Sequence, residues 1–211
     1  MKTEPRWPAV IAVLAVGGIY VAIPDYLSLG PRWLLLLVMV ILTIPIIAMH
    51  RAGLAAQARW LGIFSNSVLT LDLIWSVVLL VQALPEHKEP PGTLLRSAGG
   101  LWISNILVFA LWYWRLDAGG PGQRERREGH RTEAFLFPHF MMEEVERRQA
   151  QLARWSPNFV DYLFIAFNTS TAFSPTDTAP VARWAKGLMM LQSLISLTIV
   201  VLLAARAVNI L

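Results

Sequence analysis

Long apolar stretches dominate this sequence. Five of them contain no Asp, Glu, Lys or Arg, and a sixth is interrupted only by Asp72. They span residues 7–24, 33–49, 61–84, 97–114, 162–176 and 187–205. A helix rises about 1.5 Å per residue, so roughly 17 to 25 apolar residues cross the hydrocarbon core of a bilayer. The pattern predicts an all-α integral membrane bundle of about six transmembrane segments, of which the fifth is short and resembles a pore helix.

The composition agrees with a membrane bundle. Hydrophobic residues make up 55% of the chain and charged residues 15%, below the roughly 25% of soluble domains. The pattern divides the chain into a four-helix transmembrane region (1–114), a charged cytoplasmic loop with an amphipathic helix (115–157) and a C-terminal helix pair (158–211). The absence of cysteine excludes disulfides and thiolate metal sites. The net charge of +4 arises from loops that flank the spans, which favours membrane lipid over nucleic acid as a partner.

The distribution of basic residues predicts the orientation. If all six segments cross and the N-terminus is inside, twelve Lys and Arg residues fall on the cytoplasmic side and five on the other. Because cytoplasmic loops are enriched in Lys and Arg, we expect a multi-pass protein of the bacterial inner membrane with both termini in the cytoplasm. On this basis Gly122 is cytoplasmic, whereas Ser28, Thr93 and Thr178 are external.

The loop segment after Pro138 has apolar residues at near-helical spacing: Met141, Val145, Leu152 and Trp155. Two Glu residues each precede an Arg by four positions, which is the favourable order on a helix. The segment therefore predicts an amphipathic helix. It is either a regulatory or lipid-sensing element or a surface helix that connects two spans.

Ionisable and polar residues inside the apolar stretches are candidates for function, because such groups are costly in a membrane. Asp72 is either a cation or proton site, or a hydrogen-bonded carboxyl that ties its helix to a neighbour such as the one carrying Asn105. In the fifth stretch four polar residues stand in a row: Asn168, Thr169, Ser170 and Thr171. These residues cover all sides of a helical turn, so the turn must face protein or water.

The stretch 161–177 reads Asp-Tyr-Leu-Phe-Ile-Ala-Phe-Asn-Thr-Ser-Thr-Ala-Phe-Ser-Pro-Thr-Asp and precedes one long apolar segment. It resembles the pore helix, filter and inner helix of two-helix-type potassium channels. The resemblance implies that Thr169 and Thr171 take the threonine positions of the filter and Asp177 its terminal aspartate. Pro175 and the lack of glycine beside it argue against a potassium-selective filter. The same C-terminal region also resembles an uncharacterised family of bacterial polytopic membrane proteins, which implies no activity.

Two functions remain open. One is a channel-like pore or small-ion permease that assembles as a homo-oligomer and passes an inorganic cation along residues 168–171, Asp177 and Asp72. The alternative is a non-catalytic membrane assembly or regulatory module that binds through its arginine-rich cytoplasmic loop. We expect no enzyme, because the sequence has no Ser/His pair, His-Glu-x-x-His run or suitably spaced carboxylate pair. We likewise expect no cofactor and no metal site.

A charge pair is a further hypothesis. If the fifth segment crosses outward, Asp161 and Arg206 lie at similar depth near the cytoplasmic ends of the last two helices. An ion pair between them would lock these helices together. In the alternative, Asp161 caps its own helix and Arg206 extends to the lipid head groups.

Overall fold

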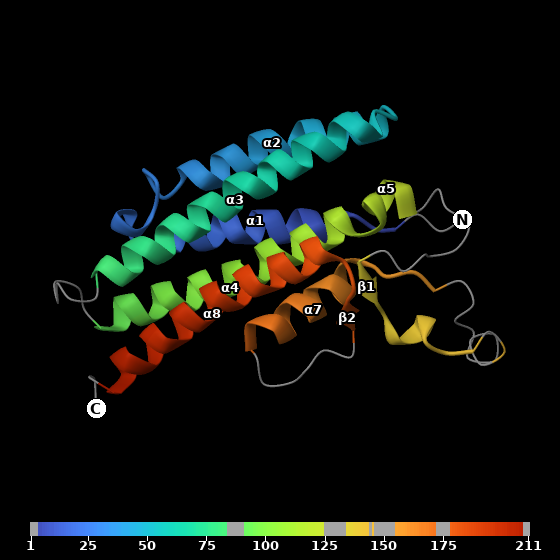
Figure 1. Cartoon of the computed structure of the whole chain (residues 1–211). Coiled ribbons are helices and arrows are strands. Elements are labelled where there is room, and N and C mark those ends of the chain that lie inside the picture. The colour runs from blue at the N-terminus through green and yellow to red at the C-terminus, as the bar shows by residue number, and fades with distance from the viewer. Residues whose placement is uncertain are drawn as a thin grey trace.

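The computed structural model describes residues 4–83, 91–124, 134–143, 145, 155–171 and 178–208. These residues form a bundle of helices with one pair of very short strands (Figure 1). The elements are α1 (Trp7–Ala22), α2 (Leu34–Arg51), α3 (Ala55–Ala83), α4 (Pro91–Leu116), α5 (Pro121–Arg124), β1 (Phe135–Leu136), α7 (Phe159–Thr171), β2 (Ala179–Pro180) and α8 (Arg183–Val208). The prediction of an all-α bundle is therefore confirmed.

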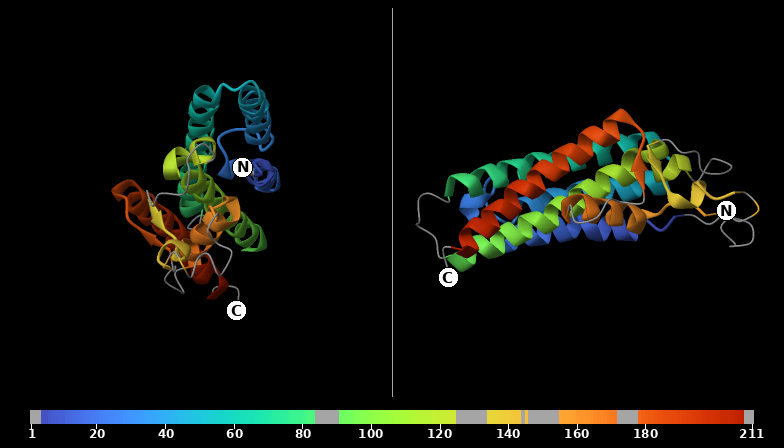
Figure 2. Two further views of the ribbon diagram at one scale, coloured as in Figure 1. Left: turned by 90° about the vertical axis from the view of Figure 1, so that its right-hand side faces the viewer. Right: turned by 60° about the horizontal axis from the view of Figure 1, so that its bottom comes forward.

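Helices α1 to α4 run alternately in opposite directions, and α4 is central. It packs against α1 and α3 on one side and against α7 and α8 on the other. Viewed from one end, α2 and α3 lie above α4, while α7 and α8 lie below it (Figure 2, left). Helix α4 thus contacts both the other N-terminal helices and the C-terminal pair, and all of them form a single packed bundle.

Four helices are long and apolar enough to span a membrane. They are α2, α3, α4 and α8, and α1 is a shorter apolar helix of 16 residues. Only 17% of the apolar window of α2 is buried inside the bundle, so its outer surface is a continuous apolar face. The helices are compatible with a membrane protein by length and composition.

Close packing and tight turns explain the arrangement of the first helices. A Cβ atom on Gly17 of α1 would lie 3.0 Å from the Cα of Leu36, so the glycine lets the backbones of α1 and α2 approach. After α2, Gly53 has φ +77° and donates its N–H to the carbonyl of His50. A glycine in the left-handed conformation ends helices readily, and here it permits the short α2–α3 connection.

We define the basic end as the end of the bundle where α1 begins, α2 and α4 end, and α3 and α8 begin. Of the nine Lys and Arg side chains that the structure describes, seven lie there: Arg6, Arg51, Arg59, Arg115, Arg124, Arg183 and Lys186. The other two, Arg32 and Arg96, lie at the opposite end.

Helix α7 is a half-length helix that runs parallel to α8. The Gln192 side chain donates to the carbonyl of Ala166 at 2.7 Å, and the Ser196 hydroxyl donates to the carbonyl of Ser170 at 2.6 Å. Partner numbers increase together, as they do only for parallel helices. With 13 residues, α7 is about 20 Å long, so it enters the bundle from the basic end and stops part-way.

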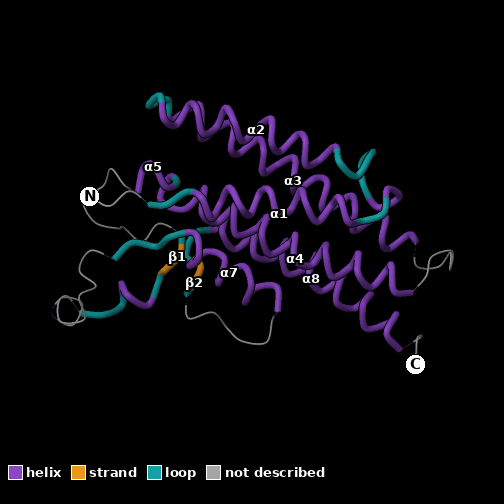
Figure 3. Tube along the Cα trace, turned by 180° about the vertical axis from the view of Figure 1, so that it is seen from behind, coloured by secondary structure: helices purple, strands orange, loops and turns teal. Residues whose placement is uncertain are grey.

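The chain then resumes at the basic end, where β2 pairs with β1 beside the start of α7 (Figure 3). The apolar stretch at residues 162–176 therefore does not run the full length of the bundle. Hydropathy predicts both termini at one end, but the first and last described residues, Glu4 and Val208, lie at opposite ends (Figure 1). For the same reason Thr178 lies at the same end as Gly122 and opposite Ser28.

Asp161 caps its own helix. Its Oδ2 accepts the main-chain N–H of Asn158 at 2.7 Å, while Asn158 Oδ1 accepts the N–H of Val160 at 2.8 Å. This reciprocal arrangement is a capping box. The hydrogen bonds of Gln192 with Ala166 and of Ser196 with Ser170 show that each α7 residue is level with the α8 residue 26 positions later. Asp161 is therefore level with Gly187. Arg206 lies 19 residues, or about 28 Å, further along α8. The hypothesis of an Asp161–Arg206 pair assumed antiparallel helices, and the parallel register places the two positions too far apart.

Much of the predicted amphipathic helix, residues 144 and 146–154, lies outside the described residues. Its flanks are described: residues Pro138–Phe140 form a 3₁₀ turn, and the rings of His139 and Trp155 stack with centroids 4.0 Å apart.

Candidate functional site

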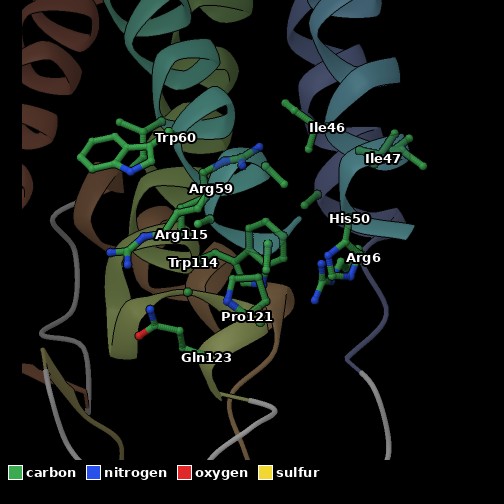
Figure 4. A pocket seen from close by; sticks show the side chains of 18 of the residues that line it. Arg6, Ile46, Ile47, His50, Arg59, Trp60, Trp114, Arg115, Pro121 and Gln123 are labelled. Atoms are coloured by element: carbon green, nitrogen blue, oxygen red, sulfur yellow. The ribbon is translucent and has the colours of Figure 1, made fainter. Parts of the chain in front are cut away.

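A cavity of about 560 Å³ opens at the basic end, between α1, α2, α3 and the turn that follows α4. Figure 4 shows Arg6 and His50 on one side of it and Arg59 and Arg115 on the other, with Pro121 and Gln123 below. Arg51 also lines it. Among the described residues that form its wall, none is acidic. The cavity thus gathers four arginines from four parts of the chain.

The deeper wall of the cavity is apolar. Val13 of α1, Ile46 of α2 and Ile63 of α3 line it, as do small residues of α1 and α3. Helix α3 also carries Gly62, where a Cβ atom would lie 1.8 Å from a terminal nitrogen of Arg115. The missing side chain therefore makes room for the guanidinium of Arg115 against α3.

Two arginines of the cavity have unpartnered polar atoms. The Nε atoms of Arg59 and Arg115 are buried and have no hydrogen-bond partner among the described residues. A buried donor without a partner costs free energy, and a donor on a charged group costs more. The excess of positive charge among the described residues of the wall favours a negatively charged ligand.

A second group of charged residues lies beside the cavity, and hydrogen bonds join its members. Arg124 is 7% exposed and donates to the carbonyls of Trp114 and Asp117 at 2.9 and 3.0 Å, and to Glu4 Oε2 at 3.1 Å. Asp117 is fully buried and accepts the hydroxyl of Tyr162 at 2.6 Å and the N–H of Ala134 at 3.1 Å. We call these residues, Glu4, Trp114, Asp117, Arg124 and Tyr162, the charge cluster. It joins the N-terminal arm, the end of α4, β1 and α7.

The polar residues predicted in the fifth stretch take part in a different cluster, in the middle of the bundle. We call it the polar cluster; it consists of Trp102, Asn105 and Tyr113 of α4, Ser170 of α7, and Gln192 and Ser196 of α8. The Tyr113 hydroxyl donates to Gln192 Oε1 at 2.5 Å, and Gln192 Nε2 donates to Ser170 Oγ at 2.8 Å. These bonds join three helices at one level.

Hydroxyl groups also satisfy the inner end of α7. The last four carbonyls of a helix have no partner within the helix. In α7 the Ser196 hydroxyl donates to the carbonyl of Ser170 at 2.6 Å, the Ser193 hydroxyl to that of Thr169 at 3.4 Å, and the Thr171 hydroxyl to that of Asn168 at 3.1 Å. Hydroxyl groups of the protein thus bond three of the last four carbonyls of α7.

The pore candidates of α7 are buried or partly buried. Thr169 and Ser170 are 9% and 4% exposed, and Thr169 donates to Ile165 of its own helix. Asn168 and Thr171 are partly buried, and Asp177 lies outside the described residues. The outer face of α7 is apolar instead, with Val160 60% exposed and Phe164 57% exposed.

Asp72 is separate from the polar cluster. Its carboxyl lies beside the phenol of Tyr20 and the main chain of Leu29, in the connection between α1 and α2. Asn105, the neighbour suggested for Asp72 by the sequence, instead donates to Ser170 and to the carbonyl of Gln192. The structure therefore places the polar run and Asp72 in different parts of the bundle.

Sequence reasoning missed the basic cavity and the charge cluster. Arg6, Arg51, Arg59 and Arg115 each lie near an end of an apolar stretch, where the orientation rule already accounts for a basic residue. Gly62, one turn after Arg59, is the one sequence signal of a close contact, and it does not reveal its partner.

Comparisons of the chain with protein-family models, with curated proteins and with solved structures find no match. Inference about function therefore depends on the geometry of the chain itself.

Proposed function

We propose that the protein is a non-catalytic membrane module whose basic end lies in the cytoplasm and binds anionic groups there. The cavity carries this proposal, because the described residues of its wall include four arginines and no acidic residue. In this arrangement α1, α2, α3, α4 and α8 cross the membrane and α7 is a re-entrant half-helix. Six further arginines belong to segments 125–133 and 146–154 of the sequence. The described residues on either side of each segment lie at this same end. The orientation rule then places this end inside.

The geometry favours this module over an ion pore. An ion path at the inner end of α7 would need carbonyl or hydroxyl oxygens facing an aqueous space. Three of the last four carbonyls of α7 already accept hydroxyl groups, and Ser170 is bonded to Asn105 and Gln192. Helices α4 and α8 pack against α7 itself, so the buried polar side chains of α7 face protein.

Reconstituted protein tests the proposal in two ways. We expect no Na⁺ or K⁺ flux above that of protein-free vesicles, for the wild type and for Thr171→Leu alike. We also expect saturable binding of inorganic tripolyphosphate by calorimetry at low ionic strength, weakening as salt shortens the Debye length to about 8 Å at 0.15 M. A cation flux that Thr171→Leu abolishes would restore the pore. Failure of all anionic probes to bind would contradict the proposed module.

A further inference from the structure

The cavity at the basic end is amphipathic. Its mouth carries guanidinium groups, and its deeper wall is formed by Val13, Ile46 and Ile63 of three apolar helices. A small inorganic anion has no apolar surface to bury against such a wall, whereas the hydrocarbon part of an amphiphile does. The gradient from charge to hydrocarbon runs from the bundle end towards its middle, as it does in a membrane leaflet.

The wall of the cavity also reaches the outer apolar surface. Ile47 on α2 and Trp60 on α3 both line the cavity, and they are 36% and 71% exposed. Tryptophan at the end of a membrane helix is typical of the head-group level. The cavity is therefore continuous with surface that lipid would cover.

Size and polarity agree with a single bound molecule. A volume of about 560 Å³ falls within the roughly 300 to 1,000 Å³ of small-molecule sites. Arg59 and Arg115 both line the cavity and, with Arg6 and Arg51, give its wall an excess of positive charge. Guanidinium groups match the geometry of phosphate oxygens.

We propose that this cavity binds one anionic phospholipid. The lipid phosphate lies between Arg59 and Arg115, and an acyl chain follows the apolar wall past Val13, Ile46 and Ile63. This inference rests on the proposed function and names the class of its ligand.

The test uses purified full-length protein in neutral detergent, stripped of lipid. Native mass spectrometry measures binding of dioleoylphosphatidylglycerol, of dioleoylphosphatidylcholine with the same chains, and of inorganic phosphate. We expect one phosphatidylglycerol to be retained, and neither phosphatidylcholine nor phosphate to be retained at equal concentration. An arginine near an anionic surface contributes about 1 kcal/mol. Arg59→Gln with Arg115→Gln should therefore weaken phosphatidylglycerol binding about 30-fold, equivalent to about 2 kcal/mol.

Two further variants make the result decisive. Arg183→Gln with Lys186→Gln removes the same charge from exposed positions at the same end, outside the cavity wall, and should change affinity less than about threefold. Ala55→Phe keeps every charge and fills the cavity from its wall, so it should also lose the lipid. It serves as the second test if the double arginine variant does not fold.

The outcomes separate this inference from the proposed function. Equal retention of both lipids by the wild type would overturn the inference, as would equal losses in the cavity and control variants. Binding of inorganic phosphate as tight as that of phosphatidylglycerol would show a soluble-anion site, which overturns the lipid and leaves the proposed function standing. Absence of any anion binding would remove both.

Discussion

Replacing Asp117 by alanine is expected to lower the free energy of unfolding by about 3 to 5 kcal/mol, the cost of breaking a buried charge network by removing one partner. Asp117 is fully buried, and its two oxygens accept the Tyr162 hydroxyl and the Ala134 N–H. Alanine would leave both donors without an acceptor and would remove a negative charge from the surroundings of buried Arg124. Reversible unfolding in mixed micelles measures the effect.

Asp25→Ala is the matched control. Asp25 pairs with Arg32 at 3.3 Å at the opposite end, but both side chains are more than half exposed. Hydrogen bonds from Arg32 lower the pKa of the Asp25 carboxyl, yet an exposed pair contributes little to stability. Equal losses in Asp117→Ala and Asp25→Ala would contradict the buried charge cluster. A double variant, Asp117→Ala with Arg124→Met, should lose less than the sum of the single variants.

Gln192→Leu is expected to cost about 2 to 4 kcal/mol. Hydrogen bonds inside membrane proteins contribute on average about 0.6 and at most about 1.7 kcal/mol each. Gln192 makes three with its side chain, to Ala166, Ser170 and Tyr113, and leucine would leave their polar groups buried without partners. The same unfolding assay applies.

Thr198→Val is the control on the same helix. Thr198 is half-buried, and its hydroxyl donates to the carbonyl of Leu194 on α8 itself, so its loss should have little effect. If the two substitutions were equally mild, the polar cluster would not be what holds α7 between α4 and α8. If Gln192→Leu lowered the free energy of unfolding more than Thr198→Val and also produced a cation flux, the polar cluster would block an ion pathway rather than only hold the helices together.

The sequence predicts where the long helices lie, but not that α7 stops part-way through the bundle and runs parallel to α8. Apolar length locates α2, α3, α4 and α8, since each is long enough to span a bilayer. The stretch that contains α7 has a similar composition, and hydropathy does not distinguish a helix that crosses from one that turns back. The polar run inside it gave the better signal: burial of Thr169 and Ser170 agrees with the prediction that this turn faces protein.

The sites were less accessible to sequence reasoning because they are made by contacts between distant segments. Glu4 and Arg124 are 120 positions apart, and neither has a local pattern that distinguishes it from other charges near a membrane. The hydroxyls of the polar run are bonded within the protein: those of Thr169 and Thr171 donate to carbonyls of α7 itself, and that of Ser170 accepts from Gln192 of α8.

Single cysteines show directly whether α7 crosses the membrane, because the chain has no cysteine of its own. Leu29, Gln123 and Val181 are exposed, in the α1–α2 connection, in α5 and just after β2 respectively. A membrane-impermeant maleimide applied to intact bacteria should label Leu29→Cys, and should reach Gln123→Cys and Val181→Cys only after the membrane is opened. This pattern would place α5, which precedes α7 in the chain, and the residue after β2, which follows it, on the cytoplasmic side with the basic cavity. Labelling of Val181→Cys in intact cells together with Leu29→Cys would show that α7 crosses the membrane, and would contradict the account.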